Sequence, residues 1–349
     1  MTLASEMATT TAGRSRELAV AVVGVLVVAG LVAASVLLGA QTLAPAQVWH
    51  ALASPTGTEA DLIVTGVRLP RTLVAVSVGA ALAVSGVLLQ AVVRNPLAEP
   101  GLLGVSAGAG FAVAAGYVLL GLTSYRDTLW LSLVGTVVGV VAVLGLTRAG
   151  GGRAGAGVGD GPVRLVLAGV AVAAVLSAAT SAVSMLSPRG FAQLARWSAG
   201  TFAGRELPVA LTTLVAVGLG VVLALALAPG LRLLALGDDT ARGLGTRVGL
   251  VRGLALLAVV VLCGAATAAA GPVAFVGLVV PQVLRLLLGH DPGRLLRGSL
   301  LAGPALVLVA DLVARTVIAP AEVSVGVVTA FVGAPVLIAL ALGHPRRLR

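Results

Sequence analysis

The stretch RLPRTLVAVSVGAALAVSGVLLQAVVRNP, at residues 68–96, decides the fold. No residue between Arg71 and Arg94 is charged, and nearly all are aliphatic or small. An α-helix rises about 1.5 Å per residue, so about 20 such residues cross the hydrocarbon core of a bilayer. Lipid offers no partners to backbone polar groups, and barrel strands alternate in polarity. A continuous apolar run of this kind therefore predicts a membrane-spanning helix.

The same pattern recurs along the whole chain. Of its 349 residues, 58% are hydrophobic and 10% are charged, and the mean hydropathy is +1.10. A water-soluble protein needs a much larger charged fraction to cover its surface. We therefore predict an all-α membrane protein with about ten transmembrane helices. The ten apolar runs lie at residues 18–40, 72–92, 101–121, 129–147, 163–186, 207–228, 254–270, 273–289, 296–318 and 323–342.

The placement of arginine predicts the orientation. All 23 basic residues are arginine, and alternating the ten spans from a cytoplasmic N-terminus puts 16 of them inside and 7 outside. Basic residues concentrate in cytoplasmic loops, so both termini are predicted to be cytoplasmic. The chain then consists of a cytoplasmic tail at 1–17, one transmembrane domain at 18–342 and a cytoplasmic tail at 343–349. The polar stretches between spans are too short for a further domain.

Several kinds of function find no suitable residues. The chain has one cysteine, Cys263, inside an apolar run, and its three histidines have no metal-ligand spacing. The Gly-rich stretch 150–157 lacks the Lys-Ser/Thr that closes a phosphate-binding loop. The sequence pI is about 11.6, but the arginines are scattered between spans, which favours membrane topology over nucleic-acid binding. We predict no catalytic residues, metal site, cofactor or nucleic-acid partner.

Two arginines, Arg68 and Arg71, fall on the outer side, which usually carries few basic residues. Their side chains would either extend to lipid headgroups or form a cationic patch that docks an acidic partner. Pro70 between them suits the first turn of a helix.

A tight inner turn follows the second span. Its prolines end helices and its glycines permit sharp backbone geometry, so by itself the pattern predicts only a turn. The residues that define the motif are Asn95, Pro96, Glu99, Pro100, Gly101 and Gly104.

The whole stretch 68–109, RLPRTLVAVSVGAALAVSGVLLQAVVRNPLAEPGLLGVSAGA, resembles the signature of the FecCD/BtuC-type permeases. These are the transmembrane subunits of ABC importers for iron–siderophores, haem and cobalamin. An unbroken match of this length is far more specific than a short motif. The segments at 271–296 and 310–335 resemble the same family, and the resemblance covers roughly residues 60–342. Gln282 and Ser324 depart from the residues His and Pro that many members carry there.

The long inner loop at about 229–253 contains a second family pattern. Two aspartates suit the start of a short helix, and Gly245 suits its end. On the residues alone, such a short helix is also compatible with a segment that only lies on the membrane surface. The pattern is similar to the coupling loop LxLGxxxAxxLG, through which members of the family contact their ATPase. The residues that carry it are Leu234, Leu236, Gly237, Asp238, Asp239, Ala241, Leu244 and Gly245.

The resemblance also implies roles at the outer face. Arg68, Arg71 and Arg315 fall on positions that dock acidic residues of the binding protein in this family. For Arg315 the residues alone offer a different explanation. Asp311 stands one helical turn before it, so the two can pair near the lipid. The loop at 148–164 aligns with the family's cytoplasmic gate.

The resemblance therefore implies a BtuC-like permease fold in a bacterial plasma membrane. The expected partners are two cytoplasmic ATP-binding subunits, one extracytoplasmic substrate-binding protein, membrane lipid and a second permease, either another copy or a sister chain. The expected activity is ATP-driven import of an iron(III)–siderophore complex, with cobalamin or haem as the alternative cargo. The permease itself is not expected to be an enzyme.

Two functions from other classes stay open on the residues alone. An intramembrane enzyme or an ion-coupled secondary transporter would need ionisable groups deep in the membrane. Asp311 and Glu322 are predicted near helix ends, and no histidine lies deep in a span. A secondary transporter would also carry no ATPase-coupling loop.

Overall fold

The computed structural model describes residues 3–39, 41–122, 124–149, 160–318 and 321–342, and these contain helices and no strand. The main helices are α1 (Leu3–Leu37), α4 (Leu69–Val93), α5 (Val105–Leu119), α6 (Tyr125–Ala149), α7 (Asp160–Ser184), α9 (Leu207–Ala226), α12 (Val248–Ala270), α13 (Val276–Leu288), α14 (Pro292–Thr316) and α15 (Val325–Leu342). Shorter elements are α2 (Pro45–Ala53), α3 (Glu59–Leu62), the π-helical η1 (Ile63–Arg68), the 3-10 helix η2 (Pro100–Leu103), α8 (Pro188–Ser198), α10 (Ala228–Ala235) and α11 (Asp238–Gly243).

The main helices correspond one by one to the ten predicted spans. Seven stretches within the described residues are long and apolar enough to cross a membrane, and three further apolar helices are shorter. Among the short ones, α5 has 15 residues and α13 has 13. At 1.5 Å per residue they rise only about 22 and 20 Å, less than the roughly 30 Å hydrocarbon core. Neither of these two helices is therefore long enough to cross that core by itself.

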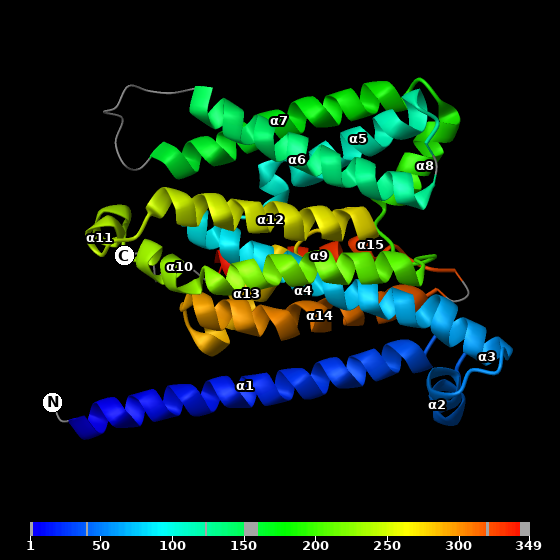
Figure 1. Cartoon of the computed structure of the whole chain (residues 1–349), viewed down its shortest axis with the longest axis horizontal. Helices are drawn as coiled ribbons and strands as arrows, with labels where there is room; N and C mark the ends of the chain where they lie inside the picture. The colour runs from blue at the N-terminus through cyan, green and yellow to red at the C-terminus, as the bar shows by residue number, and fades with distance from the viewer. Residues whose placement is uncertain (1–2, 40, 123, 150–159, 319–320, 343–349) are drawn as a thin grey trace.

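Helix α4 forms the centre of the molecule. In Figure 1 it lies between α12, α9 and α14, and its side chains are almost all buried. Small residues allow this close packing, because they let helix backbones approach in lipid. A Cβ added to Gly79 would lie 2.6 Å from the Gly303 carbonyl oxygen in α14. One added to Gly86 would overlap the Gly277 carbonyl in α13.

The helix of the second span begins earlier than the apolar run at 72–92 indicates. It is continuous from Glu59 to Val93, and the segment Ile63–Arg68 is π-helical. Thirty-five residues would rise about 52 Å, so the first turns project beyond the hydrocarbon core. The polar stretch 41–70 also contains the separate helix α2, which apolar periodicity could not indicate.

Helix α1 lies along one side of the bundle and packs chiefly on α14 (Figure 1). It starts at Leu3, so the described part of the tail predicted at 1–17 continues the helix. In the N-terminal half of this helix, Glu17 pairs with Arg294 at 3.3 Å and with Arg297 at 2.5 Å.

Helices α5 to α8 form a second group, above α12 in the view of Figure 1. Helix α8 is amphipathic and was not predicted, because the apolar run at 163–186 ends before it. Ser187 caps it by accepting a hydrogen bond from the Gly190 N–H at 3.2 Å. The predicted Gly-rich loop at 150–157 lies outside the described residues.

Candidate coupling and docking sites

The predicted docking arginine Arg71 lies inside the protein at the first turns of α4. Its Nη2 donates to Asp311 Oδ1 at 2.8 Å, and its Nη1 donates to Glu322 Oε1 at 2.8 Å. Arg71 is 5% exposed and Asp311 is fully buried. The guanidinium thus joins α4 to α14 and to the segment before α15.

Arg68 and Arg315 bind the end of α1. The last carbonyls of a helix lack intrahelical partners, so they accept hydrogen bonds from nearby cations. Arg68 Nη1 donates to the carbonyls of Val36 and Leu37 at 2.7 Å each, and Arg315 Nη1 donates to the Ser35 carbonyl at 3.0 Å. Both arginines are 5% exposed.

Arg315 also pairs with Asp311, Nη2 to Oδ2 at 2.8 Å, so the predicted pairing one helical turn apart is confirmed. The structure therefore brings all three predicted arginines together in one buried network, with partners in α1, α14 and the loop after it. Their role in docking stays a prediction. The network contains three guanidinium groups and two carboxylates, Asp311 and Glu322, and so has a net charge of +1.

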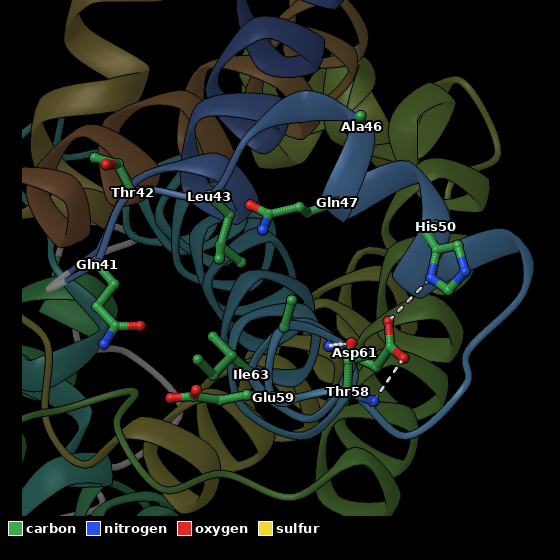
Figure 2. Close-up of a pocket in the computed structure, with 11 residues that line it drawn as sticks. Gln41, Thr42, Leu43, Ala46, Gln47, His50, Thr58, Glu59, Asp61 and Ile63 are labelled. Carbon is green, nitrogen blue, oxygen red and sulfur yellow. Dashed lines mark hydrogen bonds and ion pairs between the residues drawn. The ribbon is translucent and has the colours of Figure 1, made fainter.

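An open depression of about 920 Å³ lies beside this end of α1 (Figure 2). In Figure 2 His50 and Asp61 point toward each other, and Nδ1 and Oδ1 are 3.5 Å apart. Asp61 Oδ2 accepts hydrogen bonds from the backbone N–H of Thr56 and of Thr58. The sequence predictions included neither this depression nor the pair of His50 and Asp61. The signal for Asp61 is the Thr-x-x-Asp pattern at residues 58–61, a capping box at the start of α3.

The predicted coupling pattern forms two short helices at the opposite end of the molecule, α10 and α11 (Figure 1). Leu234 and Ala241 are fully buried and anchor the segment to the bundle. Leu236 and Leu244 are instead 63% and 60% exposed. Gly237, with φ of 110°, provides the left-handed backbone that separates the two helices, and a side chain there would be strained.

Asp238 is the buried charge of this segment, at 7% exposure. It accepts from Arg94, pairs with Arg252 at 3.0 Å and lies 3.9 Å from Arg242. Arg94 also donates to the Leu234 carbonyl at 2.8 Å. The coupling segment is therefore bound to the ends of α4 and α12. Asp239, the neighbouring carboxylate, is exposed and pairs only with Arg242 among the described residues.

The predicted inner turn, residues 94–104, is held by its own side chains and by α13. The Asn95 Oδ1 accepts from the Leu97 N–H at 2.9 Å, which stabilises the turn before η2. Gly104 has a φ of 71° and leads into α5. The Gln282 Nε2 donates to the Pro96 carbonyl at 2.5 Å. Gln282, which stands where many members of the family carry His, therefore binds the turn.

Glu99 connects this turn to the start of α13. Its Oε1 accepts a hydrogen bond from the Phe275 N–H at 2.7 Å. Next to it is a small cavity of about 130 Å³, lined among others by Ser106, Cys263 and Thr267. The sequence predictions assigned Glu99 only to a turn motif and did not place its carboxylate beside a cavity at the start of α13.

Within the described residues no three His, Cys, Asp or Glu side chains come together as a metal site. The prediction of no metal and no cofactor is not tested by this observation. The loop predicted to align with a gate, 148–164, lies largely outside the described residues.

Known proteins share this sequence and architecture. The ferric enterobactin transport system permease protein FepD of Escherichia coli (strain K12) is 45% identical over 324 residues, which cover 92% of this chain and 95% of FepD. The vitamin B12 import system permease protein BtuC of Salmonella typhi is 39% identical over 307 residues, covering 87% of this chain and 91% of BtuC.

A solved structure described as an inward-facing conformation of a metal-chelate type ABC transporter matches with a TM-score of 0.80 and 26% identity, covering 93% of this chain and 98% of that one. The model of the FecCD transport family matches residues 19–343. The resemblance found at residues 68–109 is thereby confirmed. The chain belongs to the FecCD transport family and is a multi-pass permease of the bacterial inner membrane.

Proposed function

We propose that the chain is the permease subunit of a binding-protein-dependent ABC importer and that it carries an iron(III)–siderophore complex into the cytoplasm. The relative named for ferric enterobactin shares 45% of its residues with this chain, against 39% for the relative named for vitamin B12. This 45% match is the ground for proposing a siderophore; two further relatives named for siderophore or hydroxamate import are 38% and 37% identical, no more than the vitamin B12 relative. Haem and cobalamin are the alternative cargoes.

The proposal rests chiefly on which side chains of the segment α10–α11 are exposed and which are buried. Two exposed leucines, Leu236 and Leu244, stand on a short helical segment whose other side is anchored by buried residues. Exposed apolar side chains on a rigid base are typical of a protein–protein contact. An ATP-binding subunit that covers them would deliver its movement to α4 and α12 through Asp238.

The transport cycle then needs no covalent chemistry in the permease. Two ATP-binding subunits close on ATP and move the two coupling segments of a permease dimer, which changes the side from which the central path is open. A ligand or partner shifts such an equilibrium only through different contacts with the two states. The binding protein delivers the chelate at the opposite end.

Docking of the binding protein is proposed at the end that contains Arg68, Arg71 and Arg315. The three guanidinium groups are buried, but their network has a net charge of +1, and its carboxylate Glu322 is 39% exposed in its side chain. An acidic residue of the binding protein would compete with Glu322 for Arg71. Positive potential at this end would also speed association at low salt.

The coupling role is tested with Leu236→Ala plus Leu244→Ala, co-expressed with the ATP-binding subunit. We expect at least a tenfold loss of ATP-binding subunit in the purified complex, since truncating central interface residues costs more than about 1.4 kcal/mol. Leu186→Ala is the matched control, because Leu186 is 69% exposed at the opposite end. Undiminished co-purification of the double variant would exclude this contact.

The docking role is tested by two opposite changes of charge. Glu322→Gln raises the net charge of the network from +1 to +2 and is expected to tighten binding-protein association at low salt. Arg71→Gln is expected to weaken it, with the melting temperature measured in parallel because Arg71 is buried. If neither change alters the affinity in a folded permease, the binding protein docks elsewhere.

The cargo is tested by uptake of 55Fe-labelled siderophores, 55Fe-haem and 57Co-cobalamin in a strain that lacks this gene, with and without the restored gene. Gene-dependent uptake of a ferric siderophore supports the proposal. Uptake of only haem or cobalamin would identify that compound as the cargo in place of a siderophore, and the proposal of an ABC importer would still hold. An ion-coupled transporter would take up its cargo without the ATP-binding subunit, and an intramembrane enzyme would support no uptake.

A further inference from the structure

We infer that Arg94 and Glu99 form a mechanical link from the ATPase-facing helix α11 to the cavity at the start of α13. The inference rests on the proposed function, because it takes α11 as the surface that an ATP-binding subunit moves. It assigns positioning roles to two residues of the inner turn, beyond the turn geometry for which their motif was singled out.

The link begins at Asp238. This carboxylate lies at the first turn of α11 and is buried, so a movement of α11 must carry its partners along or break the ion pairs. Arg94 is the partner that belongs to the inner turn, and it also donates to the Leu234 carbonyl in α10. A buried ion pair that loses one member leaves an uncompensated charge, which makes this contact stiff.

The link continues along the turn to Glu99. Four residues lie between Arg94 and Glu99, and this turn is held by hydrogen bonds from Gln282 to the Pro96 carbonyl and from Gln90 to the Ala98 carbonyl. Because the turn is fastened at these points, it moves as one unit rather than absorbing the displacement.

The link ends at Phe275, whose N–H donates to Glu99. Phe275 immediately precedes the 13-residue helix α13, about 20 Å from the other end of that helix. The cavity beside Glu99 is lined by this same region and by Ser106 and Thr267. Displacing Glu99 therefore changes the walls of this cavity, which Glu99 itself lines.

Backbone strain marks both ends of the link. Among the described residues, the only two other than glycine with positive φ are Arg94, at 53°, and Phe275, at 69°. Such conformations are unfavourable for residues with a side chain and persist where the surroundings enforce them, often in segments that switch. Arg94 and Phe275 both belong to the chain of contacts described above, and this is an independent observation that supports the link.

The test uses the assembled permease–ATPase complex with a single reporter cysteine. Cys263 is the only cysteine of the permease, so Cys263→Ala plus Ser106→Cys places one thiol in the cavity wall. The rate at which a small methanethiosulfonate reagent modifies this thiol is measured without nucleotide and after trapping with ATP and vanadate. We expect the two rates to differ about 5-fold or more, the lower end of typical allosteric coupling.

In this background Arg94→Ala and Glu99→Ala are each expected to abolish the difference while the ATP-binding subunit still co-purifies. Arg242→Ala is the matched control, since it also removes an arginine beside Asp238 but one that lies within α11. Glu99→Gln keeps an oxygen acceptor for the Phe275 N–H and should restore the difference. Arg94→Ala and Glu99→Ala combined should do no more than either alone, because both interrupt one path.

Four results would overturn the link, three of them in the thiol modification rates. They are no nucleotide-dependent difference in the parent complex, an unchanged difference in Arg94→Ala, or the same loss in Arg242→Ala as in Arg94→Ala. Loss of the ATP-binding subunit in Arg94→Ala alone would also overturn it, since Arg94 would then act only by holding α11 in place. Failure of the proposed function is recognised separately, because the unmodified permease would then capture no ATP-binding subunit.

Discussion

At the scale of single residues, Asp311 is the central carboxylate of the buried arginine network. It is fully buried between two guanidinium groups, those of Arg71 and Arg315. The desolvation of a carboxylate is compensated only when its partners bind it closely, as both arginines do here. Arg71 has a second carboxylate partner in Glu322, whereas among the described residues Arg315 pairs with Asp311 and donates to oxygens of Ser35 and Leu38.

Asp311→Ala is therefore expected to destabilise the permease by about 3–5 kcal/mol, because it leaves buried arginines without their counter-charge. The measurement is the free energy of unfolding in detergent, or the thermal midpoint where unfolding is irreversible. Glu322→Ala removes a partner that is 39% exposed, and as the control it should cost about 1 kcal/mol or less. Equal losses from the two variants would contradict the assignment of Asp311 as the centre of the network.

The pair Asp291–Arg232, at the opposite end, predicts a dependence on pH. Burial alone would raise the pKa of Asp291, but the hydrogen bonds from Arg232 and from the Arg294 N–H, together with their charges, hold that pKa below its usual value. A carboxylate with a lowered folded pKa stabilises the fold above its unfolded pKa of about 3.9 and loses this effect as the pH falls through the folded pKa.

The thermal midpoint of the parent should accordingly exceed that of Asp291→Asn at pH 7, by an amount corresponding to about 1 kcal/mol or less for this partly exposed pair. The difference should shrink as the pH is lowered below about 4. Asp239→Asn provides the control, since the side chain of Asp239 is 82% exposed. A difference that stays constant between pH 7 and pH 3 would show that Asp291 acts without its charge.

At the scale of elements, the packing of α4 depends on places where backbones touch. Gly86 meets the Gly277 carbonyl of α13, so a side chain there would separate α4 from α13, next to the hydrogen bond between Glu99 and Phe275. Overpacking of a core costs about 1–3 kcal/mol, and backbone cannot yield as a flexible side chain does.

Gly86→Val is thus predicted to lower the unfolding free energy by about 3 kcal/mol or more and to reduce the yield of monodisperse permease. Gly30→Val in α1 is the control, because no atom lies within 4 Å of the position of its added Cβ. Size-exclusion profiles and thermal midpoints of the two variants give the comparison. A Gly86→Val variant as stable as Gly30→Val would mean that α4 and α13 can separate without loss.

The sequence predicted the elements better than their contacts. Apolar runs located all ten main helices, since a span must be long and continuous in lipid. Helix α11 was predicted from its aspartates and glycines. The partners of Arg71 and Arg94 were not, because Asp311 and Asp238 stand 240 and 144 residues away. The π-helical turn Ile63–Arg68 was missed as well, since no local residue pattern distinguishes it from ordinary helix.

At the scale of the whole molecule, the structure has two functional ends. The coupling segment α10–α11 lies at one end, with the start of α1, and the arginine network lies at the other, near α2 and α3 (Figure 1). The prediction of 16 arginines inside and 7 outside assigns the first end to the cytoplasm. Three of the seven arginines that this prediction assigns to the outside, Arg68, Arg71 and Arg315, are buried, which leaves fewer exposed charges at that end than the count alone indicates.

Two single-cysteine variants on a Cys263→Ala background test this orientation in intact spheroplasts. A membrane-impermeant maleimide is expected to label Leu186→Cys readily and to leave Leu244→Cys unlabelled until the membrane is opened. Both leucines are well exposed, at 69% and 60%, so accessibility to the reagent is set by the side of the membrane. The inverse labelling pattern would reverse the orientation and move the coupling role away from α11.

The contacts of α1 also have a consequence for biogenesis. This helix leaves the ribosome well before α14, and the Arg315 guanidinium that binds its Ser35 carbonyl is made 280 residues after that serine. At about 5–20 residues per second, this delay is roughly 15–60 s. During that time α1 lacks α14, the helix on which it chiefly packs, so it has to be stable in the bilayer largely by itself. The absence of charged residues between Glu17 and Leu37 allows this. Arg68 reaches the C-terminal end of α1 early, and Arg315 completes the contacts there last.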